Sequence, residues 1–90
     1  MPTVITLVEN PACHFCADAE AGLDQLAREF PVTVDRVPAD SDAGQALVGH
    51  HRPSMFPLIL VDGSYFSAGR LPRAKLRALL VGGTAVGDRS

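Results

Sequence analysis

The chain has 90 residues, of which 47% are hydrophobic, and a formal net charge of -2 at pH 7. This length suits one domain, and the hydrophobic share is close to the globular average, so the chain can build a core. The charges form no long run of one sign. A nucleic-acid partner is therefore disfavoured, because nucleic-acid binding leaves a basic stripe. We expect one domain over residues 1–81, followed by a flexible C-terminal tail over residues 82–90.

No stretch of the sequence is long and apolar enough to cross a membrane. The longest apolar runs, residues 58–61 and 79–81, are far shorter than the roughly 20 residues that a spanning helix needs. Residues 1–8 contain no lysine or arginine, so the positive region of a signal peptide is missing. We therefore expect a cytoplasmic protein without a membrane partner.

The first half of the chain predicts a strand, a helix and a second strand. Residues 3–8 are β-branched and apolar, which is typical of a buried strand. From residue 13 to residue 29, apolar side chains recur at spacings of three and four, which predicts a helix with one buried face that ends at Pro31. Valines at positions 32, 34 and 37 predict the second strand. The helix is expected to turn Cys16, Ala19, Leu23, Leu26, Ala27 and Phe30 inward and Asp18, Glu20, Asp24, Gln25, Arg28 and Glu29 outward.

The second half predicts a short helix, a β-hairpin and a last helix. Ser41 or Asp42 can cap a helix that runs through residues 47 and 48, and residues 49–53 are expected to be irregular. Residues 58–61 predict a third strand. Asp62-Gly63 is a strong hairpin signal, with the returning strand beginning at residues 65–66. Residues 71–81 predict the last helix, whose expected inward side chains are Leu71, Ala74, Leu76, Leu79 and Leu80.

The predicted order is β-α-β-α-β-β-α, without internal repeats. The first two strands are joined through a helix and should be parallel, with a right-handed crossover. The last two strands should form an antiparallel hairpin. We therefore predict an α/β protein with a four-stranded mixed sheet flanked by helices, which is the smallest element set of a thioredoxin fold.

Cys13 and Cys16, the only cysteines, stand where the first strand ends and the first helix begins. Only a thiolate is a nucleophile, and the unpaired N–H groups and positive dipole end of a helix start stabilise an anion. Cys13 gains most from this position, and Cys16, one turn further on, faces back toward it. We predict a thiol–disulfide oxidoreductase in which Cys13 attacks protein or low-molecular-weight disulfides and Cys16 resolves the mixed disulfide.

His14 and Phe15 separate the two cysteines. A protonated His14 would favour the Cys13 thiolate and make the oxidised pair more oxidising, although its side chain can equally face solvent. We predict that Phe15 is an exposed apolar contact for substrates and not part of the core.

Other interpretations of the cysteine pair remain open. A structural disulfide is disfavoured, because the loop it would enclose is too small to constrain the unfolded chain. Zinc is a competitor, since two thiolates with His50 and His51 can make a tetrahedral set, and an iron–sulfur cluster between two subunits would use the same soft ligands. A redox-silent interaction domain would use Phe15, Met55 and Phe56 only as a partner surface.

Three stretches of the sequence resemble the glutaredoxin group of the thioredoxin superfamily, and above all a set of short bacterial glutaredoxin-like proteins. They are residues 11–16 (PACHFC), residues 55–63 (MFPLILVDG) and residues 69–71 (GRL) with the leucines that follow. The resemblance covers residues 3–81 and implies the same fold and exchange chemistry. It also implies that the Phe56–Pro57 bond is cis and that Pro57 faces the cysteine pair. The backbone of Phe56 would then be free to pair with an extended substrate.

The resemblance leaves the reductant open. Glutaredoxins typically carry Pro-Tyr between the cysteines, where this chain has His14-Phe15. They also carry a pair of glycines that contact glutathione, where this chain has only Ser67-Ala68-Gly69. Arg70 lies in a matching stretch and is expected to attract a carboxylate of glutathione or of another low-molecular-weight thiol, as co-substrate. Residues 66–70 also resemble redoxins that reduce ribonucleotide reductase. We expect no resident cofactor or metal, partners that are disulfide-containing proteins or small thiols, and a monomer.

Overall fold

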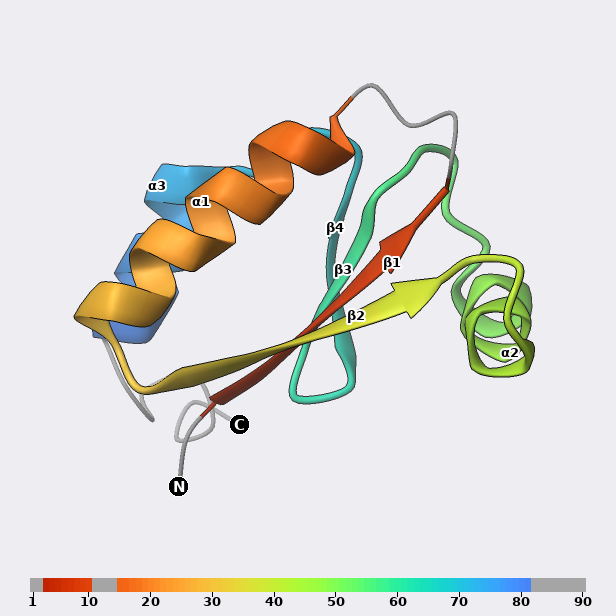
Figure 1. The fold of residues 1–90 in the computed structure, drawn as a ribbon, viewed down its shortest axis with the longest axis horizontal. Coiled ribbons are helices and arrows are strands. Elements are labelled where there is room, and N and C mark those ends of the chain that lie inside the picture. The colour runs from red at the N-terminus through yellow and green to blue at the C-terminus, as the bar shows by residue number, and fades with distance from the viewer. Residues whose placement is uncertain (1–2, 11–14, 82–90) are drawn as a thin grey trace.

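A four-stranded sheet with helices on both faces forms the protein (Figure 1). The structure, a computed structural model, describes residues 3–10 and 15–81. The elements follow the predicted order β-α-β-α-β-β-α, and none of the described helices is long and apolar enough to span a membrane. They are β1 (Thr3–Glu9), α1 (Cys16–Glu29), β2 (Val32–Pro38), α2 (Asp42–His51), β3 (Leu58–Val61), β4 (Ser64–Ala68) and α3 (Arg73–Val81).

The sheet has the strand order β2-β1-β3-β4. Strand β1 pairs in parallel with β2 and antiparallel with β3, and β3 pairs antiparallel with β4. The predicted parallel crossover pair, the hairpin and the mixed sheet are therefore confirmed. The hairpin turns at Asp62 and Gly63, which both have positive φ, as an Asp-Gly turn favours. The Asp62 carboxylate also accepts a hydrogen bond of 2.9 Å from the N–H of Val4 on the central strand.

The alternation of side chains along the strands divides the core into two layers. Helices α1 and α3 cover one face of the sheet and α2 lies on the other (Figure 1). The α1 layer holds Ile5, Leu7, Ala19, Leu23, Leu26, Ile59, Leu71 and Leu76, all buried. The α2 layer holds Val8, Leu58 and Leu60, with the partly buried Val37, Ala39, Leu47, Val48 and Phe56 packed against them.

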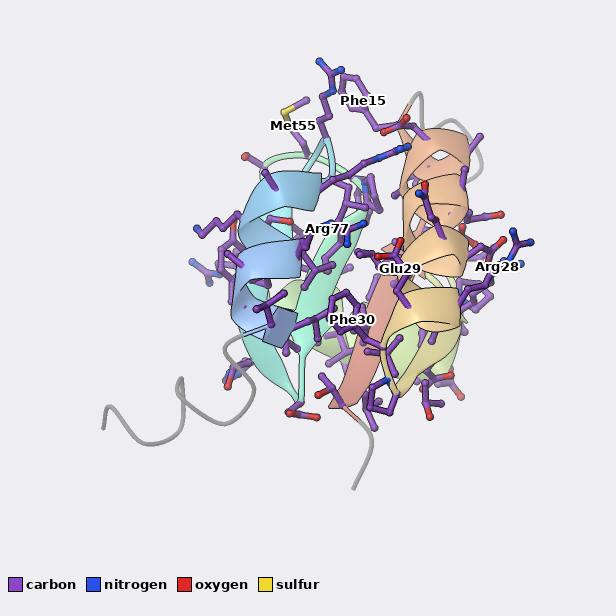
Figure 2. The ribbon with its side chains drawn as sticks, turned by 90° about the vertical axis from the view of Figure 1, so that its left-hand side faces the viewer. Phe15, Arg28, Glu29, Phe30, Met55 and Arg77 are labelled. Carbon is purple, nitrogen blue, oxygen red and sulfur yellow. The ribbon has the colours of Figure 1, made fainter. Side chains whose placement is uncertain are left out.

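Two ion pairs join α3 to α1. The guanidinium group of Arg73 lies 2.8 Å from the carboxylate of Asp18. At the other end of the helices, the two terminal nitrogens of Arg77 bind the two carboxylate oxygens of Glu29 (Figure 2). Hydrogen bonding to Arg77 holds the pKa of Glu29 below its ordinary value. These pairs hold α3 in one rotation relative to α1. Leu76 anchors the buried side of α3.

Two helix boundaries differ from the prediction. Helix α2 continues to His51, so His50 and His51 lie in its last turn and not in an irregular loop. The helix ends at Arg52, which adopts left-handed backbone with φ 48° and donates its N–H to the carbonyl of Val48. Helix α3 begins at Arg73 and not at Leu71, because the residue before a proline is steered away from helical backbone.

Several side chains also lie elsewhere than predicted. Ala27 and Ala74 are exposed, because the buried leucines decide how each helix rotates and these alanines fall beside the buried stripe. Glu20 is half-buried, whereas the helical pattern predicts an outward position. Helix α1 begins at Cys16, and Cys13 and His14 lie outside the described residues, as does the predicted tail.

Two glycines of α2 provide a matched test of how the helix packs on the end of β2. Gly44 is buried, and a Cβ there would lie 1.9 Å from the carbonyl oxygen of Pro38, which belongs to the backbone and cannot easily move. A Cβ on Gly49 would meet nothing within 4 Å. Urea denaturation should therefore show that Gly44→Ala lowers the free energy of unfolding by about 2–4 kcal/mol, while Gly49→Ala raises it by about 0.5–1 kcal/mol. Equal effects of the two substitutions would contradict this packing.

Candidate functional site

Three chain segments meet at the edge of the sheet where β1 ends. Val8 pairs with Leu58, and Leu58 pairs with Ala68, so the end of β1 lies beside the start of β3 and the end of β4. Helix α1 begins at this same edge, and Figure 2 shows Phe15 and Met55 together there. Of the predicted site residues, the edge gathers Phe15, Cys16, Phe56, Pro57 and Arg70. Cys13 and His14, which lie outside the described residues, remain predictions.

Cys16 is the first residue of α1 and only 8% of its surface is exposed. It is disulfide-bonded. The N-cap residue is Phe15, whose carbonyl accepts a 2.9 Å hydrogen bond from the N–H of Ala19 and whose side chain has no oxygen with which to cap the first turn. The positive end of the helix dipole is therefore directed at the segment that precedes α1, where it favours an anion.

The segment before β3 forms a second wall of the site. The Phe56–Pro57 bond is cis, as predicted. Pro57 is buried, Phe56 is half-buried and Met55 is 49% exposed. Phe15 is half-buried as well, whereas the sequence predicts an exposed side chain. Met55 is thus the more exposed apolar side chain at this edge, and it presents a flexible thioether to solvent.

Gly69 holds this wall in place from the end of β4. Its N–H donates a 2.9 Å hydrogen bond to the carbonyl of Pro57, and its φ of +95° is one that residues with a side chain rarely adopt. A Cβ at Gly69 would also lie 3.2 Å from the sulfur of Met55. The positive φ therefore favours a glycine here, and a Cβ would also require a small shift of the exposed Met55 side chain. Arg70 follows directly and is exposed.

A pair of carboxyl groups lies at the same end of the sheet, on the α1 side. Glu9 is the last residue of β1, and the alternation of the strand turns it to the face of Ile5 and Leu7. Burial, followed by hydrogen bonding with and repulsion from Glu20 of α1, raises the pKa of Glu9 to about 7, against a smaller opposing effect of Arg36. Arg36 of β2 approaches the Glu20 carboxylate to 3.7 Å.

The Oε2 atom of Glu9 is buried without a hydrogen-bond partner among the described residues. Two ionised carboxylates cannot hydrogen-bond to each other, whereas a proton on Glu9 supplies a donor for the Glu20 carboxylate. With its pKa raised to about 7, Glu9 remains partly protonated near neutral pH.

Sequence reasoning missed this carboxyl pair, although two signals for it were present. Glu9 has the same parity as Ile5 and Leu7, which predicts the same buried face of the strand. Glu20 stands four residues after Cys16, so the two side chains share one side of the helix. Because the helix carries many charged residues, the sequence pattern does not show which of them faces the sheet.

The two histidines of α2 are not brought to the cysteine. Their rings contact each other edge-on at 4.6 Å, and α2 lies on the face of the sheet opposite α1. Within residues 3–10 and 15–81, no three His, Cys, Asp or Glu side chains are placed to hold a metal ion. The arrangement therefore offers no support for a set of Cys16 with His50 and His51.

The structure is similar to those of thioredoxins. A thioredoxin from Thermus thermophilus is 26% identical, with a TM-score of 0.63 over 96% of this chain and 79% of that one. A thioredoxin variant from Halobacterium salinarum is 21% identical, with a TM-score of 0.65 over 87% and 71% of the two chains. Thioredoxin O2 from Arabidopsis thaliana, in the oxidised state, is 15% identical, with a TM-score of 0.68 over 91% and 75%.

No protein-family model and no curated protein sequence matches the chain. The structural neighbours confirm the predicted thioredoxin fold and support a place in the thioredoxin superfamily. They do not confirm the narrower glutaredoxin-like group.

Replacing Glu9 with glutamine tests the raised pKa of Glu9. Because the pKa of Glu9 is higher in the folded chain than its ordinary value of 4.5, ionising Glu9 opposes folding, and stability falls as the pH rises from 4.5 through about 7. Glutamine mimics the protonated acid. Urea denaturation should find Glu9→Gln more stable than the wild type at pH 8, by about 1 kcal/mol after allowance for solvent screening. The two proteins should be nearly equal at pH 4.

Asp24→Asn is the matched control, because it removes an exposed carboxylate of α1 that also lies near Arg36, at 3.8 Å. This variant should keep the fall in stability between pH 4 and pH 8. A Glu9→Gln protein that is less stable than the wild type at both pH values would rule out the raised pKa of Glu9.

Proposed function

We propose that this protein is a thiol–disulfide oxidoreductase that uses Cys13 and Cys16. The observation that carries the proposal is the place of Cys16, which opens a helix at the edge where the ends of β1, β3 and β4 converge. The likeness to thioredoxins, one of them in its oxidised state, supports it. With only two cysteines, both in this motif, the chain has none left for structural disulfides, so we propose the reducing cytoplasm as its compartment.

The two thiols take different roles because their surroundings differ. Cys16 is 8% exposed, so a substrate disulfide in solution has poor access to its sulfur. A mixed disulfide on a neighbouring cysteine of the same chain does not need that access from solvent. Cys13 stands three residues earlier, ahead of the positive end of α1, where the thiolate is favoured. Cys13 is therefore the attacking thiol and Cys16 the resolving thiol.

The cycle transfers two electrons in two exchanges. The Cys13 thiolate attacks one sulfur of a substrate disulfide, the substrate S–S bond breaks, and one substrate thiolate leaves and takes a proton from water. Cys16 then loses its proton and attacks the Cys13 sulfur, which releases the second substrate thiol. The cysteine pair is left as a disulfide and the substrate is reduced. An external thiol reductant, glutathione or another low-molecular-weight thiol, reverses these exchanges and restores the pair.

The side chains around the edge suit a substrate with both apolar and anionic groups. Met55 offers exposed apolar surface, and Phe15 and Phe56 offer the accessible parts of two rings. Arg70 adds an exposed cation that can attract a carboxylate. We propose that Phe15, Phe56, Pro57 and Arg70 contact the substrate and that His14 modulates the Cys13 thiolate.

Single serine variants test the roles of the cysteines in an insulin reduction assay driven by dithiothreitol. Cys13→Ser removes the nucleophile, so the protein-dependent rate should fall by at least about 100-fold. Cys16→Ser keeps the attack but lacks the resolving thiol, so after the reduced variant is freed of dithiothreitol and mixed with insulin, a covalent adduct with the substrate thiol should accumulate at Cys13 and be visible by mass spectrometry. Circular dichroism should show that both variants are folded.

Equal activity of the wild type and Cys13→Ser would overturn the proposed function. Metal analysis of protein purified without chelators separates the remaining alternative. Close to one zinc or iron atom per chain, with both cysteines protected from thiol reagents, would favour a metal-binding module over an exchange enzyme.

A further inference from the structure

Arg73, the first residue of α3, lies across the start of α1. Its Nη2 atom donates to two oxygens of Asp18, the carboxylate at 2.8 Å and the backbone carbonyl at 3.1 Å. One turn further along α1, a Cβ added to Gly22 would lie 2.8 Å from the Nε atom of Arg73. The Arg73 side chain thus passes over the bare backbone of Gly22 and reaches the first turn of the helix.

This arrangement places a compensating positive charge at the first turn of α1, the helix that begins with Cys16. Asp18 stands two residues after Cys16, in the first turn of α1, where its carboxylate favours the helix through the dipole. The same negative charge disfavours a second anion nearby, and the reaction proposed above needs a thiolate at Cys13. The guanidinium group of Arg73 offsets the Asp18 charge at its source.

The connection has a mechanical side as well. Arg73 follows the Gly69–Leu71 stretch by only a few residues, and Gly69 binds the carbonyl of Pro57. Leu71 packs in the α1 layer of the core, and a Cβ on Gly22 would also meet its Cδ2 atom at 2.8 Å. The start of α1 and the wall at Pro57 are thereby joined through one short, well-packed segment.

We propose that Arg73 is a positioning residue for the thiol–disulfide exchange. Arg73 holds the carboxylate of Asp18 in place at the first turn of α1 and offsets the negative charge that would otherwise lower the reactivity of Cys13. The inference rests on the proposed function of the cysteine pair. It assigns to an α3 side chain, 55 positions from Asp18 in the sequence, an electrostatic effect on the nucleophile.

The test measures how fast iodoacetamide alkylates Cys13 in the reduced, full-length protein at pH 6, with the modified cysteine located by peptide mapping. Below the pKa of the reacting thiol, this rate follows the fraction of thiolate, so the measurement is repeated at lower pH if the rate at pH 6 has already reached its plateau. Arg73→Met keeps an apolar stem over Gly22 but leaves the Asp18 charge without its partner, so the rate should fall about threefold at low ionic strength, with a smaller effect as added salt screens the exposed carboxylate. Asp18→Asn leaves Arg73 unopposed, so the rate should rise by a similar factor.

The double variant Arg73→Met/Asp18→Asn distinguishes charge from structure. If the effect is electrostatic, the double variant has neither charge and should return to the wild-type rate. If Arg73 only supports the fold, the double variant should be at least as impaired as Arg73→Met, and that result would overturn the inference. Arg73→Lys, which retains the charge on a shorter side chain, should stay close to the wild type, and urea denaturation should show all variants folded under the assay conditions.

The proposed function and this inference fail in distinguishable ways. A wild-type protein that does not reduce insulin and whose Cys13 alkylates no faster than a simple thiol would remove the function itself. A wild-type protein that reduces insulin, with alkylation rates unchanged in Arg73→Met and Asp18→Asn, would leave the function standing and remove the role of Arg73.

Discussion

Strand β1 is hydrogen-bonded on both sides, parallel to β2 and antiparallel to β3, and the site depends on this double pairing. Parallel pairing with β2 requires a crossover, so α1 starts near the end of β1 and carries Cys16 there. Antiparallel pairing with β3 brings the Met55–Pro57 segment to that same end, and β4 adds Gly69 beside it. A slip of one residue in the register of β1 would expose Ile5 and Leu7. Burial of these side chains under α1 therefore fixes the register of β1 and, with it, the position of the site at the end of this strand.

The first turns of α1 carry several negative charges, and neighbouring elements compensate for them. On the sheet side, Glu20 meets Glu9 of β1, with Arg36 of β2 close by. On the opposite side, Asp18 is held by Arg73 of α3. A helix that serves a thiolate must keep its own carboxylates from opposing that anion. Here the raised pKa of Glu9 on one side and the guanidinium group of Arg73 on the other both reduce the negative charge at the first turns of α1.

Much of this architecture could be predicted from the sequence, because its signals are local. The β-branched, apolar run of residues 3–8 and the helical spacing up to Phe30 predict two elements, and Asp62-Gly63 predicts the hairpin. The cis bond before Pro57 followed from resemblance and not from periodicity. The end of α2 was missed, because its extension through His51 and the left-handed backbone of Arg52 carry no clear sequence signal.

Contacts between distant segments could not be predicted. Nothing in the sequence joins Gly22 to Arg73, since the bare backbone of one matters only when α3 packs against it. The half-buried position of Glu20 depends in the same way on where β1 ends. The sequence position of Glu9 indicates the buried face of the strand, but its raised pKa depends also on the carboxylate of Glu20, which packing places opposite. Sequence patterns thus predicted the elements, whereas the electrostatic surroundings of α1 emerged only from packing.

The reduction potential of the cysteine pair tests the central claim most directly. The full-length protein is equilibrated with mixtures of reduced and oxidised glutathione, remaining thiols are blocked, and the products are weighed by mass spectrometry. A single two-electron transition is predicted, from a chain with two blockable thiols to one with an internal disulfide between Cys13 and Cys16. Two thiols that persist across the whole range, or that form only glutathione adducts without an internal disulfide, would contradict the account.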